Sequence, residues 1–113
     1  MKKYTEERPW GKFERFTQNE VSTVKILTVE PNQQLSVQYH HKREEFWRVI
    51  EGACEIILGE ETHKAKEGDE FFVPKETKHS IKTIDLQVKI MEISLGEFDE
   101  EDIVRVEDRY GRA

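Results

Sequence analysis

The stretch of sequence that decides the fold reads Gln38-Tyr39-His40-His41-Lys42-Arg43-Glu44-Glu45-Phe46-Trp47-Arg48-Val49-Ile50. Alternate side chains of a β-strand point to the same face, so Gln38 and His40 project together. A short polar turn follows, and Glu45 then opens an apolar strand, which brings its carboxylate back beside this pair. The stretch therefore predicts a strand, a turn and a second strand, with three potential metal ligands close to the turn.

A second unit of the same kind supplies a fourth potential ligand. Gly68 and Asp69 mark a turn, residues 70–73 form a strand that ends at Pro74, and His79 starts the next strand. Taken singly, a His or Glu beside a turn in so charged a chain is usually solvated surface rather than a ligand. Taken together, the side chains predict one divalent ion bound by Gln38, His40, Glu45 and His79.

The chemistry of this ligand set narrows the choice of ion. Imidazole, carboxylate and amide groups suit a borderline divalent metal; we expect zinc, with manganese, cobalt, nickel and iron as alternatives. No Cys belongs to the set, which excludes a closed thiolate site. Positions would remain open for water or substrate, as a catalytic metal requires.

Short β patterns separated by Gly, Pro and Asn turns recur along the chain. This regular spacing predicts an all-β sandwich or barrel. Only Asp99 to Val104 looks helical, with Asp99 as the cap of a single short turn. The expected strands cover residues 11–17, 23–29, 33–40, 45–50, 53–58, 61–65, 70–73, 79–83 and 86–94.

Two charged residues near these strands are candidates for catalysis. Glu92 shares one face of the last expected strand with apolar residues, so it points inward. Such a carboxylate would have a raised pKa and could move protons, or it could simply hydrogen-bond a neighbour; both interpretations stay open. Arg43 lies in the ligand-bearing turn, where its guanidinium could bind a phosphate or pair with a carboxylate such as Glu44. Trp10 and Trp47 are expected to pack in the core or at the rim of the barrel rather than to stack on a ligand.

Composition indicates one small domain spanning residues 1–113, because this length and 35% hydrophobic content supply one modest core. A net charge of −6 and a pI near 5.3 argue against nucleic acid or acidic membranes as partners. The N-terminus lacks the apolar run of a signal peptide and no segment is long enough to span a membrane, so we expect a cytoplasmic protein. The single Cys54 is expected to be a reduced core thiol.

Longer segments resemble a known family. From Asn32 to Gly52 the chain resembles the first cupin motif, and residues 68–79 resemble the second, although Asn32 and Glu76 stand where these motifs have Gly. More narrowly, Arg8-Pro9-Trp10-Gly11, residues 35–47 and residues 101–112 look like the type II phosphomannose isomerase domain. That domain is the C-terminal part of bifunctional mannose-6-phosphate isomerase/mannose-1-phosphate guanylyltransferases. The resemblance covers nearly the whole chain.

The resemblance implies a cupin-type β-barrel, also described as a double-stranded β-helix or jelly roll, that pairs into a homodimer. It also implies interconversion of mannose 6-phosphate and fructose 6-phosphate through an enediol, with a metal polarising the sugar oxygens. Arg43 would then steady negative charge and Glu92 is one candidate for the base. Three further arginines would contact the sugar phosphate or form surface ion pairs, namely Arg105, Arg109 and Arg112.

Other functions remain open. No glycine-rich phosphate loop of the nucleotide-binding type occurs, so guanylyltransferase activity is not expected. A cupin that binds a sugar phosphate without turnover is one alternative. Another is a cupin enzyme of different chemistry, such as a dioxygenase, which would need a redox-active metal.

Overall fold

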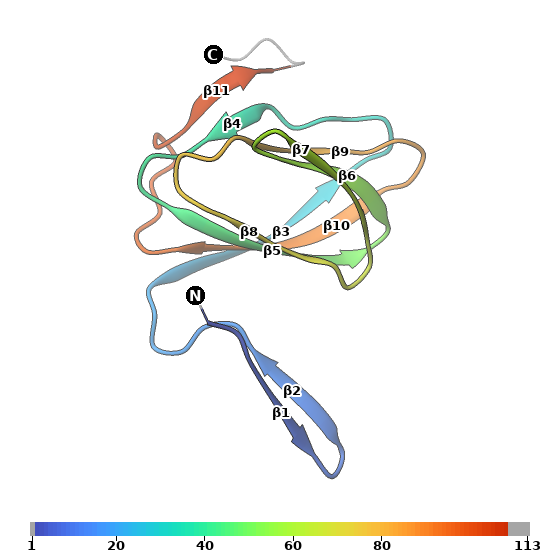
Figure 1. Cartoon of the computed structure of the whole chain (residues 1–113), viewed down its shortest axis with the longest axis vertical. Coiled ribbons are helices and arrows are strands. Elements are labelled where there is room, and N and C mark those ends of the chain that lie inside the picture. Colours follow the sequence, from blue (N-terminus) through green and yellow to red (C-terminus); the bar gives the residue numbers. More distant parts are fainter. Residues whose placement is uncertain (1, 109–113) are drawn as a thin grey trace.

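The computed structural model describes residues 2–108, which form a β-barrel of two facing sheets with a hairpin extending from one end (Figure 1). One sheet has the strand order β3-β10-β5-β8 and the other has the order β11-β4-β9-β6-β7. The strands are β1 (Tyr4–Arg8), β2 (Gly11–Arg15), β3 (Ser22–Val29), β4 (Val37–Tyr39), β5 (Glu44–Glu51), β6 (Ala53–Leu58), β7 (Glu61–Lys66), β8 (Glu70–Val73), β9 (His79–Lys82), β10 (Val88–Leu95) and β11 (Val104–Glu107).

The core lies between the inner faces of the two sheets. Trp47 and Val49 point inward from β5, and Ile90 faces them from the neighbouring β10. Ile56 and Ile81 are paired across β6 and β9 in the opposite sheet, and both are fully buried. Because alternate residues of each strand contribute to this apolar interior, burial of its side chains favours closure of the sheets over one core.

The expected all-β barrel is confirmed, and each expected strand has a counterpart. The strands at 53–58 and 70–73 match residue for residue, whereas the expected strand 33–40 is shortened to β4. Two strands were missed, β1 and β11. No helix forms within residues 2–108, and so none that could cross a membrane was found among them.

The segment expected to be helical makes one turn only. The Asp99 carboxylate accepts a hydrogen bond from the amide of Glu101 (3.0 Å), and the Asp99 carbonyl accepts one from the amide of Asp102 (3.1 Å). Asp99 therefore caps a turn as expected, but Val104 already opens β11. Pairing of β11 with β4 satisfies the backbone groups that a continuing helix would otherwise have bonded internally.

Several turn positions have a positive φ, and three of them bear on the site and its frame. Asn32 and Glu76, which replace the glycines of the cupin motifs, have φ values of 58° and 59°. Gly52 has φ +83°, and a Cβ atom there would lie 2.1 Å from the Gln87 carbonyl oxygen. Gly52 thus allows the β5–β6 turn to pass close to the chain that enters β10, which no other residue could do without a shift of the backbone.

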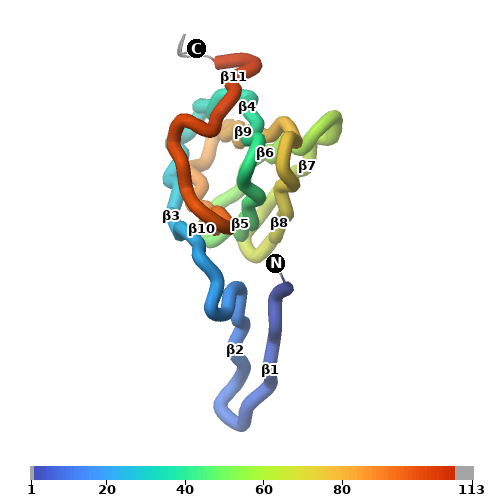
Figure 2. The backbone as a smooth tube through the Cα atoms, turned by 90° about the vertical axis from the view of Figure 1, so that its left-hand side faces the viewer, coloured from blue at the N-terminus to red at the C-terminus, as the bar shows by residue number. Residues whose placement is uncertain are grey.

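The β1–β2 hairpin projects away from the barrel, at the end opposite β11 (Figure 2). Its base is tied to the outer face of the four-stranded sheet. Lys3 bridges Glu14 and Glu70, each at 2.9 Å, and Arg48 pairs with the same two carboxylates. This ionic cluster lies on the outside of the sheet and leaves the barrel interior to the site described next.

Candidate metal centre and its pocket

Three of the four predicted ligands lie together inside the barrel. His40 follows β4, Glu45 lies in β5 and His79 opens β9, and each is at most 2% exposed. The Glu45 oxygens lie 3.6 Å from His40 Nε2 and 3.7 Å from His79 Nε2. One nitrogen or oxygen from each residue lies within 4.8 Å of the others, so the group could bind a metal ion.

Backbone carbonyls hold both imidazoles in one orientation. His40 Nδ1 donates to the carbonyl of Asp102, and His79 Nδ1 donates to the carbonyl of Thr77 at 2.9 Å. A carbonyl can only accept, so each ring carries its proton on Nδ1 and presents the lone pair of Nε2 to the centre. This arrangement, with an outer partner fixing the tautomer, is typical of histidines that bind metals.

The residues present fit a divalent metal. His79 Nε2 is buried and has no hydrogen-bond partner within residues 2–108, which is costly for a polar atom unless something binds it. Burial lowers the pKa of His40 and of His79, so both rings are neutral ligands near neutral pH. Two neutral imidazoles and a carboxylate suit a borderline divalent ion, but the arrangement does not identify the metal.

Gln38, the fourth predicted ligand, is adjacent to this group. It pairs with His79 across β4 and β9, so both side chains lie on the same face of the sheet. Ser36 Oγ donates to Gln38 Oε1 at 3.1 Å, and Gln38 lines the same pocket as His79. Its role as a metal ligand remains a prediction.

Glu45 is fixed by three donors in addition to its histidine neighbours. Arg43 Nε lies 3.1 Å from Oε2, Trp47 Nε1 lies 3.2 Å from Oε1, and Ser94 Oγ lies 3.5 Å from Oε2. Arg43 also donates from Nη2 to His40 Nε2 at 3.2 Å. Trp47 lies in the core as expected. It also orients the Glu45 carboxylate, a role that the sequence did not indicate.

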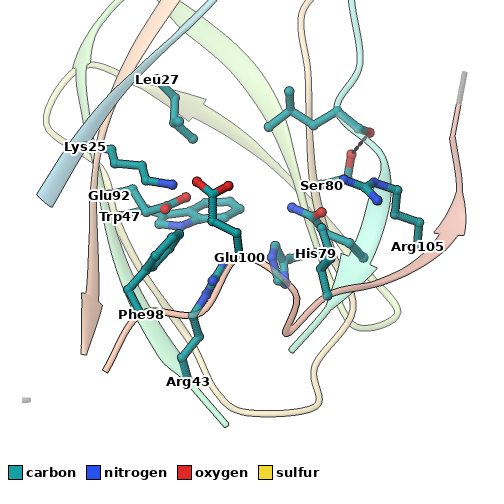
Figure 3. A pocket seen from close by; sticks show the side chains of 13 residues that line it. Lys25, Leu27, Arg43, Trp47, His79, Ser80, Glu92, Phe98, Glu100 and Arg105 are labelled. Atoms are coloured by element: carbon teal, nitrogen blue, oxygen red, sulfur yellow. Dashed lines mark hydrogen bonds between the residues drawn. The ribbon is translucent and has the colours of Figure 1, made fainter. Parts of the chain in front are cut away.

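A pocket of about 280 Å³ is lined by His79 of this group (Figure 3). Basic side chains from three elements line it, namely Lys25, Arg43 and Arg105, together with the acidic Glu92 and Glu100. In the view of Figure 3, Lys25, Glu92 and Phe98 lie on one side and Ser80 and Arg105 on the other, with His79 between. This polar lining, with three cationic and two acidic side chains, is suited to a ligand that carries a negative charge and hydroxyl groups.

Glu92 lies inside the pocket, as its strand position predicted. It is 8% exposed, and burial, followed by repulsion from Glu45, raises its pKa to about 7. Its protonation therefore changes near neutral pH, which a proton-transfer group requires. A side-chain hydrogen bond with Ser94 also acts on this carboxylate, so both interpretations of Glu92 remain predictions.

Of the three arginines predicted to contact the substrate, only one lies within the described residues. Arg105 lines the pocket from β11, whereas Arg109 and Arg112 lie outside the described residues. The sequence reasoning missed Lys25 and Phe98. Lys25 could have been found, because it alternates in phase with the inward-facing Leu27 and Val29 along β3. Phe98 lies in a loop, where no periodic pattern indicates direction.

Curated relatives and solved structures match this chain. It is 36% identical to mannose-1-phosphate guanylyltransferase ManC of Salmonella typhimurium, covering 93% of this chain and 22% of the relative. It is 37% identical to xanthan biosynthesis protein XanB of Xanthomonas campestris pv. campestris, covering 93% and 23%. The capsular polysaccharide assembling protein CapF of Staphylococcus aureus superposes with a TM-score of 0.71 at 16% identity, covering 94% of this chain and 34% of CapF. The chain thus spans less than a quarter of the length of these curated relatives.

Two expectations about activity are wrong. Relatives are named as mannose-1-phosphate guanylyltransferases or as polysaccharide biosynthesis proteins, not as isomerases, which contradicts the expected interconversion of mannose 6-phosphate and fructose 6-phosphate. The same names contradict the exclusion of guanylyltransferase activity. The error has a physical reason: the motifs around His40 and His79 specify a barrel and a metal-binding geometry, and one fold supports many reactions.

The family is shown by a match over the whole described region. Residues 2–108 match the family described as mannose-6-phosphate isomerase C-terminal. The matched region includes the potential metal ligands, the pocket and β11. The fold is the cupin-type β-barrel, and the chain belongs to the mannose-6-phosphate isomerase C-terminal family.

Proposed function

We propose that this chain is a metal-binding cupin domain that binds a hexose phosphate next to the metal, in the service of mannose-1-phosphate guanylyltransferase chemistry in polysaccharide biosynthesis. The observation that carries the proposal is the buried group of His40, Glu45 and His79, which opens onto a pocket lined by basic side chains. The metal, when bound, would act as a Lewis acid toward ligand oxygens.

The shape and polarity of the pocket support a small sugar ligand. Its volume of about 280 Å³ is at the lower end of the range for small-molecule sites, which favours one sugar ring over a complete sugar nucleotide. Arg43 and Arg105 place two guanidinium groups at the pocket, and their positive charge favours a phosphate. Trp47 supplies the apolar floor while its indole nitrogen stays committed to Glu45.

The names of the relatives support the choice of sugar. ManC is named for mannose 1-phosphate and guanylyl transfer, and XanB for xanthan biosynthesis. We therefore propose mannose 1-phosphate as the first ligand to test. We also propose that the chain works in the cytoplasm beside a nucleotidyltransferase, either within the same protein or as a partner.

Calorimetric titration of zinc-loaded protein with mannose 1-phosphate tests this proposal. The loaded protein should bind the ligand, and a chelator should abolish binding. His79→Ala should lose both the metal and the ligand, because it removes an Nε2 ligand atom from the centre. His63→Ala is the matched control, since His63 lies on β7 and pairs with Glu61 away from the pocket.

The outcome that overturns the proposal is equally clear. If elemental analysis finds no metal in reconstituted protein, or if loaded protein binds mannose no less tightly than mannose 1-phosphate, the proposed function is wrong. Equal binding by the parent and His79→Ala would show that the ligand binds elsewhere.

A further inference from the structure

Lys25 is an unusual side chain for its position. It lies on β3 in phase with Leu27 and Val29, and all three face the interior of the barrel. Strands in such barrels normally place apolar residues on this face, because burying a charge is costly unless it is compensated. Lys25 lines the pocket beside the metal centre, so its ammonium group is directed into the space where a ligand would bind.

An aromatic ring holds this ammonium group in place. Lys25 Nζ lies 4.1 Å from the centre of the Phe98 ring, and the guanidinium carbon of Arg43 lies 4.5 Å from the same centre. Cations are attracted to the face of such a ring, so Phe98 positions two positive groups at one wall of the pocket. Figure 3 shows Lys25, Phe98 and Arg43 along that wall.

The two cations differ in how far their charge is already balanced. The Arg43 guanidinium is bonded to Glu45 at 3.1 Å and to His40 at 3.2 Å. Lys25 forms no ion pair shorter than 4.0 Å within residues 2–108, and its charge interacts only at longer range with Glu92, which lies opposite it in the register of β3 and β10. Of the two cations, Lys25 is therefore the one whose ammonium group has no direct hydrogen-bonded carboxylate and can donate to a ligand.

We propose that Lys25, seated on Phe98, binds the phosphate group of the ligand. This inference rests on the proposed function, which it deepens by assigning the phosphate to one wall of the pocket. An ammonium group offers three donors and a compact charge, which suits a phosphate dianion. With the phosphate on this wall, the sugar ring extends toward His79 of the metal centre, and His79 lies between Lys25 and Arg105 in Figure 3.

The test compares a charge-removing variant with a matched control. Lys25→Met keeps most of the length of the side chain and removes its charge. Lys89→Met removes a lysine from β10, where Lys89 is 43% exposed and reaches Glu51 at 4.0 Å, outside the pocket. Both variants and the parent are loaded with zinc and titrated with mannose 1-phosphate, with mannose, and with inorganic phosphate monitored by phosphorus NMR.

Loss of a charge-assisted hydrogen bond should weaken mannose 1-phosphate binding to Lys25→Met by at least about tenfold. Affinity for mannose, metal content and the circular dichroism spectrum should match the parent. Lys89→Met should behave as the parent with every ligand. Phe98→Leu keeps both cations but removes the ring, and should give a smaller loss with mannose 1-phosphate.

The controls separate failure of this inference from failure of the proposed function. If the parent binds mannose 1-phosphate and Lys25→Met binds it equally well, the phosphate lies elsewhere and the inference is wrong while the function stands. If the parent binds inorganic phosphate through Lys25 but prefers no sugar phosphate, the phosphate subsite stands and the proposed function fails. Equal losses with mannose and mannose 1-phosphate would show a general disruption and overturn the inference.

Discussion

Replacing Glu92 by Gln should stabilise the metal-free protein at alkaline pH. The raised pKa, about 7 against an ordinary 4.5, means that the folded chain holds this proton more tightly than the unfolded chain. Each pKa unit corresponds to about 1.4 kcal/mol, so ionising the buried carboxylate costs the folded state about 3 kcal/mol once the pH exceeds both values. Glutamine has nearly the same shape and avoids this cost.

The sign of the effect sets the pH window. For a carboxyl group whose pKa is raised on folding, the stabilising contribution is complete below 4.5 and is lost as the pH rises through about 7. The free energy of unfolding of Glu92→Gln should therefore match the parent at the acidic end and exceed it by about 3 kcal/mol near pH 8. Urea denaturation in the presence of a chelator, repeated across this range, measures the difference directly.

A control variant separates the effect of the buried Glu92 from a general loss of negative charge. Glu97→Gln removes an exposed carboxylate outside the pocket and should change stability little at any pH. The four histidines are present in every variant, so any contribution from them largely cancels in the difference. A Glu92→Gln protein that is no more stable than the parent at alkaline pH would refute the reasoning that burial and the nearby Glu45 destabilise the charged form of Glu92.

Three other substitutions have expected outcomes. Arg43→Met should raise zinc affinity in a competition titration, because the guanidinium occupies the lone pair of His40 that a metal needs; weaker zinc binding would contradict this. Asp102→Ala should lower unfolding free energy by about 1–2 kcal/mol, because its carboxylate accepts from the two amides that follow His40; an unchanged urea midpoint would contradict it. Gly52→Ala should lower the melting temperature by roughly 10 °C or more, since its Cβ would meet the Gln87 carbonyl; an unchanged melting temperature would be inconsistent with that contact.

The three residues of the metal group could be predicted from the sequence because each lies at a recognisable strand end or turn. His40 and Glu45 lie on either side of one short turn, so local geometry alone brings them together. His79 was harder, since β9 pairs with β4 only in the complete barrel. It was found because the strand and proline turn before it repeat the pattern of the first unit.

The missed elements lacked such local signals. The strand β1 is largely polar on both faces, because it belongs to a hairpin that packs little against the barrel, and so it shows no apolar alternation. The strand β11 is stabilised by β4, which lies far away in the sequence. The orientation of the Phe98 side chain could not be predicted, because it depends on contacts with Lys25 and Arg43 in the folded chain. The activity was misjudged for a different reason, since the residues that specify this barrel do not specify its reaction.

The bond between His40 Nδ1 and the Asp102 carbonyl has a consequence for the order of folding. These two residues are 62 positions apart. The six strands β5 to β10 lie between them in the sequence, and β11 follows Asp102. Closing such a long loop is slow compared with forming a hairpin, so the His40 ring stays free to rotate until the C-terminal segment docks. A nascent chain that has not yet emerged beyond Asp102 would bind metal weakly. Tight metal uptake would then mark completion of the barrel during synthesis.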